Sequence, residues 1–287
     1  MRERYILYAA IVLIAAGLTS FRWPLVDGSI TSTFGESRWD HFHDGVDMVS
    51  REMKVYPVEA GALLFCWDRA LFPLENYPGG GNYSIIEHRN GLCSIYMHLE
   101  NGLPRKGVYS DRDPVGIMGD TGHSFSRHIH FSLVRPVEGV SLNPLTLLPS
   151  LDDTTPPKID EIAFRIGEKI VIVRDGADIR LTRHYPLLVK ISDAVSGKGT
   201  MGVYRLSAVH NGRKAMDVEF RSIDLSPGGP AVRGMDFDRL FDSNGYYKIG
   251  NVVYAEGENN FLIAATDYAG NRTEKEFRFN VKLDLQE

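Results

Sequence analysis

The sequence predicts an all-β protein built as two units that are joined by a proline-rich linker. Residues 23–149 hold short strand-like runs separated by glycine and asparagine turns, among them GALLFCW, NYSIIEH, LCSIYMHL and HIHFSLV. Glycine and proline interrupt every stretch that could hold a helical period, so we expect no helix longer than a short turn there. Beyond the linker, runs such as KIVIVRD, PLLVKISDA and YRLSAVHN alternate in polarity, which is typical of a β-sandwich.

The first 22 residues predict export. Arg2 and Arg4 precede an uncharged run, residues 5–20, that fits the n-region and h-region of a signal peptide. The run is shorter than the roughly 20 residues that span a bilayer comfortably, yet no clean cleavage site precedes Phe21. A cleaved signal and an N-terminal anchor in the inner membrane both stay open, with the periplasm or cell envelope as the expected location and this segment as the only membrane contact.

The charge balance argues against nucleic-acid partners. The chain has 37 acidic and 32 basic residues, a net charge of −5, and no block of like charge. A protein that binds DNA or RNA normally carries a basic surface that neutralises phosphates. We therefore expect no nucleic-acid partner.

The elements of residues 23–149 are expected to form an antiparallel sheet. Asn90 and Gly91 stand between two strand-like runs and tolerate the positive φ angles of a hairpin turn. Cys66 and Cys93 each lie in a strand-like run, and the sequence leaves open whether they pair in a disulfide or stay as two buried thiols. Four prolines between Pro144 and Pro157 then mark the boundary, with residues 150–158 as the linker and residues 159–287 as the second domain.

The HIHF run predicts two imidazoles aimed at one site. In an extended strand His128 and His130 point to one face, while Ile129 and Phe131 point to the other face and can be buried. The HDGVD run adds a second pair of candidate ligands. The step from His43 to Asp47 fits one helix face, but Gly45 and Val46 favour a turn that enters a strand; either geometry lets both side chains reach one ion.

Two histidines and one carboxylate are the protein ligands of a catalytic zinc site, which keeps a fourth position for water. Ferrous iron can use the same set. Two further imidazoles are surplus to an oxygenase, but in a hydrolase they can serve as general base or bind an oxyanion. The spacing therefore favours a hydrolytic zinc centre and leaves open which histidine of HIH is the ligand.

Residues 23–146 resemble the M23 zinc metallopeptidases of the lysostaphin and LytM type, which cleave peptide bonds in bacterial peptidoglycan. The shared motifs, in family order, are WPLVDGSITSTFG, FHDGVDM, PVEAGALLF, GGGNYSIIEHRNGLCSIYMHL, GIMGDTGHS and HIHF. The resemblance implies that His43, Asp47 and His130 ligate Zn²⁺ and that His98 and His128 are the catalytic pair. It also implies an antiparallel LytM-like fold and a zinc endopeptidase that acts on stem or cross-link peptides.

The same family contains members that have lost ligands and only activate other cell-wall hydrolases. A catalytically silent wall-binding module or activator is therefore the alternative function. This chain keeps all five key positions, which favours an active enzyme. It departs from the family pattern at Arg127, where small residues are usual, and in the longer, more acidic KGVYSDRDPVG stretch; both departures can narrow the substrate groove.

Asp40, His41 and Asp44 flank the first ligand in sequence. Asp40 and Asp44 are candidates to orient an imidazole, because a ligating histidine usually donates its other N–H to a carboxylate or carbonyl. His41 is expected to lie on the surface or behind a ligand.

The second domain resembles bacterial immunoglobulin-like domains in the run NNFLIAATDYAGNRTEKEFRF. We expect Asp267, Gly270 and Asn271 to form the turn between its last strands. A calcium site at this acidic turn is disfavoured, because the ligands visible in the sequence fall short of a full oxygen cage. The default expectation is a spacer or a binding module for other cell-envelope proteins, since fold alone does not determine function.

Overall fold

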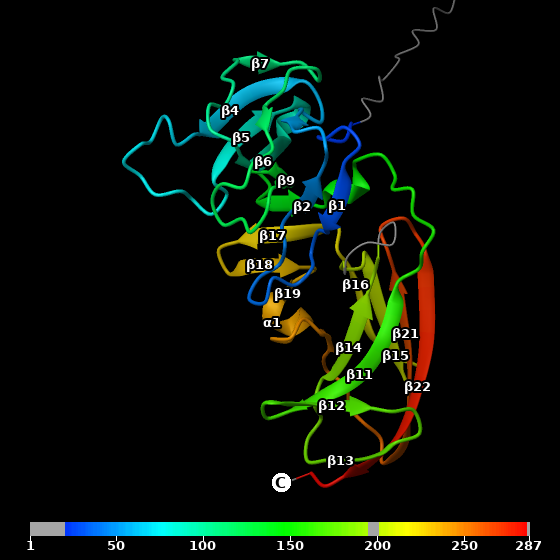
Figure 1. Cartoon of the computed structure of the whole chain (residues 1–287). Helices are drawn as coiled ribbons and strands as arrows, with labels where there is room; N and C mark the ends of the chain where they lie inside the picture. The colour runs from blue at the N-terminus through cyan, green and yellow to red at the C-terminus, as the bar shows by residue number, and fades with distance from the viewer. Residues whose placement is uncertain (1–20, 195–200, 286–287) are drawn as a thin grey trace, which may run out of the picture.

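The computed structural model describes residues 21–194 and 201–285, and it is nearly all β (Figure 1). The predicted export segment, residues 5–20, lies outside these residues. No helix in the described part of the chain is long and apolar enough to cross a membrane. The prediction of an all-β fold with antiparallel sheets is confirmed.

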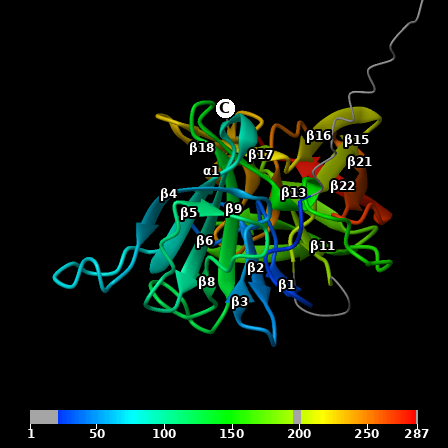
Figure 2. The ribbon, with the colours of Figure 1, turned by 90° about the horizontal axis from the view of Figure 1, so that it is seen from above.

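A large sheet dominates the N-terminal half, with the strand order β10-β9-β6-β5-β4-β7; β2 also pairs with β9, and β1 pairs with β2. Its elements are β1 (Ser29–Ser32), β2 (Val46–Val49), β4 (Gly61–Trp67), β5 (Asn82–Glu87), β6 (Cys93–Leu99), β7 (Val108–Tyr109), β9 (Ile129–Arg135) and β10 (Val140–Leu142). A separate two-stranded ladder joins β3 (Lys54–Val55) to β8 (Gly116–Ile117), and two single 3₁₀ turns are η1 (Arg89–Gly91) and η2 (Pro144–Thr146). Figure 2 shows β4, β5, β6 and β9 side by side.

The β5–β6 connection has the predicted hairpin geometry. Its strands pair antiparallel, and Asn90 and Gly91 adopt φ angles of 61° and 67°. Those angles are accessible to asparagine and glycine at little steric cost. Cys66 in β4 and Cys93 in β6 are free thiols, and β5 lies between their strands.

The C-terminal half contains two further sheets, in the orders β12-β11-β14-β20 and β13-β22-β21-β15-β16. Their strands are β11 (Lys158–Ile166), β12 (Lys169–Val173), β13 (Asp178–Leu181), β14 (Leu187–Ser192), β15 (Arg205–His210), β16 (Arg213–Glu219), β20 (Tyr247–Ile249), β21 (Gly257–Thr266) and β22 (Arg272–Leu283). Alternate residues of both sheets bury one shared core, which includes Ile162, Val189, Phe261 and Phe279. The sheets therefore form a sandwich, while its immunoglobulin-like character stays a prediction.

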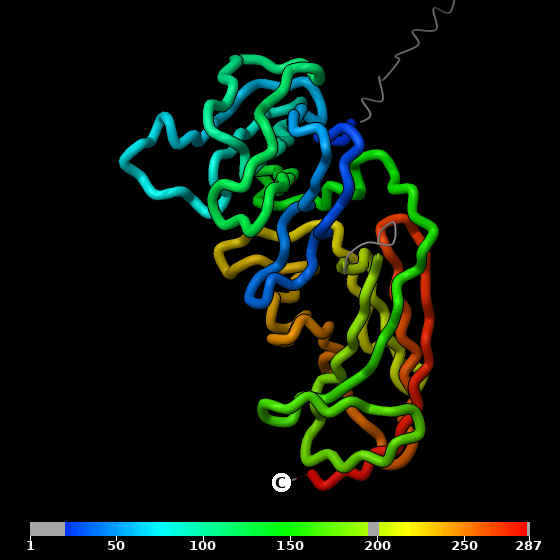
Figure 3. The backbone as a smooth tube through the Cα atoms, viewed as in Figure 1, coloured from blue at the N-terminus to red at the C-terminus, as the bar shows by residue number. Residues whose placement is uncertain are grey.

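Three strands from the C-terminal half extend the N-terminal sheet. They are β17 (Ser222–Ser226), β18 (Gly229–Val232) and β19 (Met235–Asp236), followed by the one-turn helix α1 (Phe237–Leu240). Strand β17 pairs antiparallel with β10, so these strands lie between the two halves in Figure 1. The chain thus returns to the first sheet after it has crossed the proline-rich segment, whose path along one side is clear in the tube of Figure 3.

The loop between β1 and β2 packs into the core of the C-terminal half. Phe34 and Phe42 are buried there, and the ring of Phe42 lies 5.4 Å from that of Phe237. Gly35 has a φ of 78°, and a Cβ atom at this position would lie 2.5 Å from the ring of Phe220. Only glycine permits this approach, so the loop that ends at the candidate ligands is anchored by the second half of the chain.

Candidate metal centre

Pairing between β2, β9 and β6 brings the predicted site residues together. Asp47 in β2 stands directly opposite His130 in β9, and His130 also pairs with Met97 in β6. His98 follows Met97, so it reaches the same end of the sheet. Ile129 and Phe131 are fully buried on the opposite face, as the alternation in HIHF predicts.

Gly45 is required by the close packing of this region. A Cβ atom at Gly45 would lie 2.6 Å from His130 Nε2 and 2.6 Å from the carbonyl oxygen of Phe131. Both distances are well inside van der Waals contact. The glycine therefore lets the HDGVD segment approach β9, and Asp47 enters a strand as the turn interpretation predicts.

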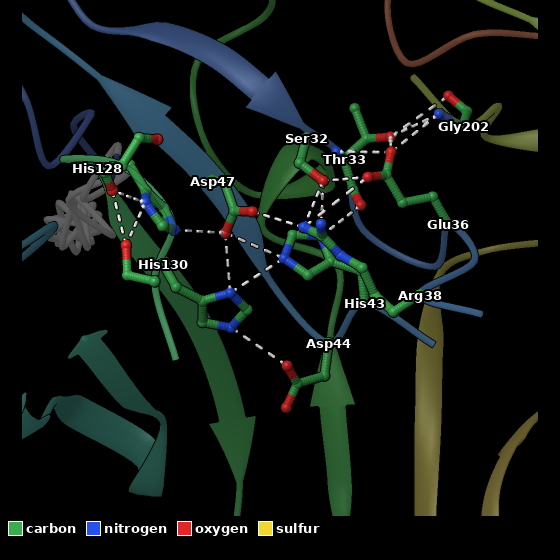
Figure 4. A network of polar contacts seen from close by, with 12 residues as sticks. Ser32, Thr33, Glu36, Arg38, His43, Asp44, Asp47, His128, His130 and Gly202 are labelled. Carbon is green, nitrogen blue, oxygen red and sulfur yellow. Dashed lines mark hydrogen bonds and ion pairs between the residues drawn. The ribbon is translucent and has the colours of Figure 1, made fainter. Parts of the chain in front are cut away.

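Three donor atoms converge in the way a tetrahedral metal requires (Figure 4). His43 Nε2 lies 3.1 Å from Asp47 Oδ1 and 3.0 Å from His130 Nδ1, and the last two atoms are 3.0 Å apart. Zinc bonds of about 2.0–2.1 Å at tetrahedral angles place ligand atoms about 3.3 Å apart. All three residues are buried, and together they form a group that could hold a metal ion.

The hydrogen bonds of the two imidazoles direct their lone pairs toward Asp47. His43 donates its Nδ1–H to the carbonyl oxygen of Thr33 at 2.7 Å. His130 Nε2 lies 2.9 Å from Ser132 Oγ and 3.2 Å from Asp44 Oδ1, and a carboxylate oxygen can only accept, so this contact favours a proton on Nε2. With a proton on each of these two nitrogens, His43 Nε2 and His130 Nδ1 are the ring nitrogens that remain to ligate a cation beside Asp47 Oδ1. A proton on His130 can offset the charge of Asp47, and a divalent metal that binds these atoms would replace that proton.

The contacts among these residues also shift the pKa values of Asp47 and His130. Burial would raise the pKa of Asp47, but hydrogen bonds and charge from His130 and His43 outweigh it and hold that pKa well below its ordinary value. Burial would lower the pKa of His130, but Asp44 and Asp47 outweigh it and raise that pKa. The site thus stabilises positive charge between these groups.

His98 and His128 form a second pair beside the three ligating candidates, with ring centroids 4.8 Å apart. His98 donates from Nδ1 to the carbonyl oxygen of Thr121 at 2.8 Å, and His128 donates from Nδ1 to that of Ser126 at 2.7 Å. In the neutral rings each Nε2 is then a free acceptor, and His128 Nε2 lies 3.8 Å from Asp47 Oδ1. The pair is oriented to accept protons.

His98 is also held in an unusual state. Its φ of 61° is in the left-handed region, which is uncommon for a non-glycine residue. Burial is the largest cause that lowers its pKa, the hydrogen bond to Thr121 opposes burial, and the charge of His128 adds to the decrease, giving a pKa of about 4. At neutral pH His98 is therefore an uncharged base.

Arg38 is a contact that the sequence did not predict. Its guanidinium donates to Asp47 Oδ2 at 2.5 Å and to Ser32 Oγ at 2.6 Å. Glu36 accepts from Ser32 and from the backbone N–H of Gly202 at 3.1 Å, so the network in Figure 4 reaches the second half of the chain. Arg38 precedes His43 by several residues and belongs to no recognisable motif, so the sequence held no signal for its contact with Asp47.

Of the residues next to the candidate ligands in sequence, Asp44 contacts a ligand and the others lie on the surface. Asp44 lies against His130 rather than against its sequence neighbour His43. Asp40 and His41 pair with each other at 2.6 Å on the exposed surface, so Asp40 orients no ligand. Arg127, at the predicted rim, is half exposed and ion-paired with Glu100 at 2.8 Å.

Residues 41–144 match the model of Peptidase family M23. This part of the chain is an M23 peptidase domain. A second family model, without a functional description, matches residues 163–282. The resemblance that the motifs predicted is thereby confirmed, and the M23 domain contains all five histidine and aspartate candidates.

The chain is also similar to named peptidases, of which it spans only a minor part of the length. It is 34% identical over 80 residues to the peptidoglycan DD-endopeptidase ShyA of Vibrio cholerae, covering 26% of this chain and 19% of that protein. The DD-carboxypeptidase/endopeptidase Mpg of Neisseria meningitidis is 29% identical over 177 residues, 59% of this chain and 37% of that protein. A crystal structure of a zinc-containing peptidase from Vibrio cholerae is 26% identical, with a TM-score of 0.34, over 40% of this chain and 36% of that one.

Proposed function

We propose that this chain is an exported zinc endopeptidase that hydrolyses peptide bonds in the stem or cross-link peptides of peptidoglycan. The observation that carries the proposal is the convergence of three donor atoms, from His43, Asp47 and His130, beside the two free acceptors of His98 and His128. The names of several relatives supply the substrate class, since they describe peptidoglycan DD-endopeptidases. The DD cross-link is therefore the first bond to test.

In this proposal His43, Asp47 and His130 hold the zinc ion. Bound zinc supplies a Lewis acid that polarises the scissile carbonyl and lowers the pKa of water. Thr33 and Asp44 fix the tautomers of the two ligating imidazoles, so that their lone pairs stay directed at the site. Arg38 fixes the second oxygen of Asp47.

His98 and His128 perform the proton chemistry. Each ring is oriented by an Nδ1–H bond to a backbone carbonyl, which leaves Nε2 free to take the proton of the attacking water. The protonated ring then offers an N–H to the oxyanion of the tetrahedral intermediate and to the departing amine. The low pKa of His98 keeps it in the unprotonated form at neutral pH.

The basic and apolar leader, residues 1–22, supports an envelope location, where peptidoglycan is accessible. The sandwich, residues 159–287 in the predicted division, serves as a spacer or as a binding module beside the peptidase domain. Its strands β17 to β19 extend the peptidase sheet, which favours a fixed arrangement of the two parts.

The test is the release of free amines from isolated sacculi by the purified chain. We expect release with zinc and none with a chelator or with Asp47→Asn. Asp40→Asn is the matched control, because Asp40 is an exposed carboxylate outside the site, and it should behave as wild type. Release that is unchanged by the chelator, or equal in Asp47→Asn, would contradict the proposal. Binding to sacculi without any release by the zinc-loaded chain would support a silent binding module instead.

A further inference from the structure

A second cluster of metal-ligating side chains lies at the junction of the linker and the sandwich. Asp153 belongs to the linker, Asp193 follows β14, and Asp267 follows β21. One carboxylate oxygen from each lies within 4.8 Å of the others. The cluster is outside the M23 segment, residues 41–144, and has no part in the proposed mechanism.

Asp193 is the member that points to a ligand. Asp193 is only 2% exposed, and neither of its carboxylate oxygens has a hydrogen-bond partner within residues 21–194 and 201–285. Asp153 Oδ2 is likewise buried and unpartnered in that part of the chain. Buried carboxylate oxygens are nearly always paired, because an unpaired buried charge is costly. Oxygens of this kind, gathered in one place, indicate a site that can bind a cation.

The described side chains around the cluster do not compensate for this charge. Among the described residues, none of the three carboxylates forms an ion pair with a lysine, arginine or histidine. Burial and then the negative charge of Asp267 raise the pKa of Asp193 to about 7; the nearby amide of Ala194 lowers it and Asp153 raises it further. Repulsion within the cluster is therefore strong in the absence of an ion.

Asn271 holds two of the three carboxylate-bearing segments together. Its side-chain amide donates to Asp267 Oδ2 at 2.9 Å and to the backbone oxygen of Asp153 at 3.0 Å. The backbone N–H groups of Ala269 and Asn271 donate to Asp267 Oδ1 at 2.9 and 2.8 Å. The turn thus fixes Asp267 before any ion binds.

We propose that Asp153, Asp193 and Asp267 bind one calcium ion. Calcium takes six to eight oxygen ligands at about 2.3–2.6 Å in irregular geometry, so two ligands of one ion lie at most about 5 Å apart. The separations in the cluster satisfy this limit. Magnesium requires a near-ideal octahedron with several retained waters, and zinc prefers nitrogen and sulfur donors. An all-carboxylate set from three separate segments fits calcium best.

Calcium at this position would tie the linker to both halves of the molecule. Met201, whose backbone N–H donates to the carbonyl oxygen of Asp193, is buried in the core of the N-terminal half. Tyr268, next to Asp267, donates its hydroxyl to the backbone oxygen of Phe34. The site would therefore stabilise the junction whether or not the chain is a peptidase.

The test is a titration of the metal-free full chain with calcium chloride and, in parallel, magnesium chloride. Isothermal titration calorimetry measures binding, and thermal unfolding measures the stabilisation that binding to the folded state must produce. We expect one calcium per chain with a dissociation constant of roughly 0.1–1 mM, the range of extracellular calcium modules, and weaker magnesium binding. Asp193→Asn and Asp153→Asn should each weaken calcium binding at least about tenfold.

Two controls make the result specific. Asp152→Asn removes an exposed carboxylate from the same linker, and His130→Ala removes a candidate ligand of the other cluster; both should keep the calcium response. Asp193→Asn should fold, because it removes an unpaired buried charge. The proposal is overturned if the wild-type chain shows no calcium response at about 10 mM, well above the range for such modules. An equal response in Asp193→Asn and Asp153→Asn would also overturn it.

Discussion

The two carboxylate-containing clusters of this chain differ in how their charge is balanced. In the first, two imidazoles and Arg38 surround Asp47. In the second, Asp153, Asp193 and Asp267 face one another with no cationic partner among the described residues. The candidate ligand atoms differ as well. The first cluster offers two imidazole nitrogens and one carboxylate oxygen, and the second offers carboxylate oxygens alone.

This difference predicts two different ions and two different roles. A nitrogen-rich tetrahedral set suits zinc and leaves a coordination position for chemistry, whereas an oxygen set suits a hard cation such as calcium. The first cluster lies beside two further imidazoles that can move protons. The second lies beside two strand ends and the linker, where we expect an ion to stabilise the junction. In our proposals, one chain separates a catalytic site from a stabilising one.

The largest effect on activity should come from the first cluster itself. Asp47→Asn and His130→Ala should each reduce peptidase activity to the level of the chelator-treated wild type, because each removes a ligand. Zinc content, measured by mass spectrometry of the purified protein, should fall in parallel. A variant that keeps stoichiometric zinc and full activity would show that these side chains are not the ligands.

The neighbouring imidazoles should affect rate but not metal content. His128→Ala and His98→Ala should each lower kcat by roughly 10²–10⁴-fold, the usual contribution of a positioned acid or base. Zinc content should equal that of wild type. If zinc is lost from either variant, the division into ligands and proton-transfer residues is wrong.

Arg38 should have a smaller effect. Arg38→Gln removes the cation beside Asp47 Oδ2, and loss of a group that orients a ligand typically weakens metal binding by 10–100-fold. Because Arg38 is partly exposed, we expect zinc affinity to decrease by about tenfold, the lower end of this range. Competition with a chelating dye measures the affinity. Arg127→Gln is the control, since its partner is Glu100 rather than a candidate ligand, and an equal decrease there would refute a specific role for Arg38.

The second cluster should change stability and leave kcat unchanged. The raised pKa of Asp193 means that between about pH 4 and pH 7 the folded chain holds a proton that the unfolded chain releases. Its contribution to the free energy of unfolding therefore falls as pH rises through this window, by at most about 1.4 kcal/mol per pH unit. In metal-free protein, Asp193→Asn should gain stability over wild type from pH 5 to pH 7.5 in urea unfolding. If the free energies of unfolding of Asp193→Asn and wild type differ by the same amount at pH 5 and pH 7.5, the raised pKa of Asp193 is contradicted.

The sequence predicted the first cluster because its signals are local. The alternation in HIHF fixes which side chains share a face, and the step from His43 to Asp47 places two ligands within one turn and strand entry. The spacing alone could not choose between His128 and His130. That choice depends on the register of β9 against β2, which places His130 opposite Asp47.

The second cluster could not be predicted because its residues lie far apart in the sequence. Asp153, Asp193 and Asp267 come from three segments, separated by 40 residues (193 − 153) and 74 residues (267 − 193). The acidic turn at Asp267 showed too few ligands by itself, and only the packing of the linker against two strand ends supplies the others. The pairing of β17 with β10 is equally non-local and left no pattern in the sequence.

The most direct test of the central claim is mass spectrometry of the muropeptides that remain after defined peptidoglycan is treated with the zinc-loaded chain. The proposed roles predict that cross-linked dimers decrease and monomers with a new free amine accumulate. They also predict that zinc-loaded His128→Ala leaves the dimers intact. An unchanged muropeptide profile with the wild-type chain, or the same cleavage with His128→Ala, would contradict the account.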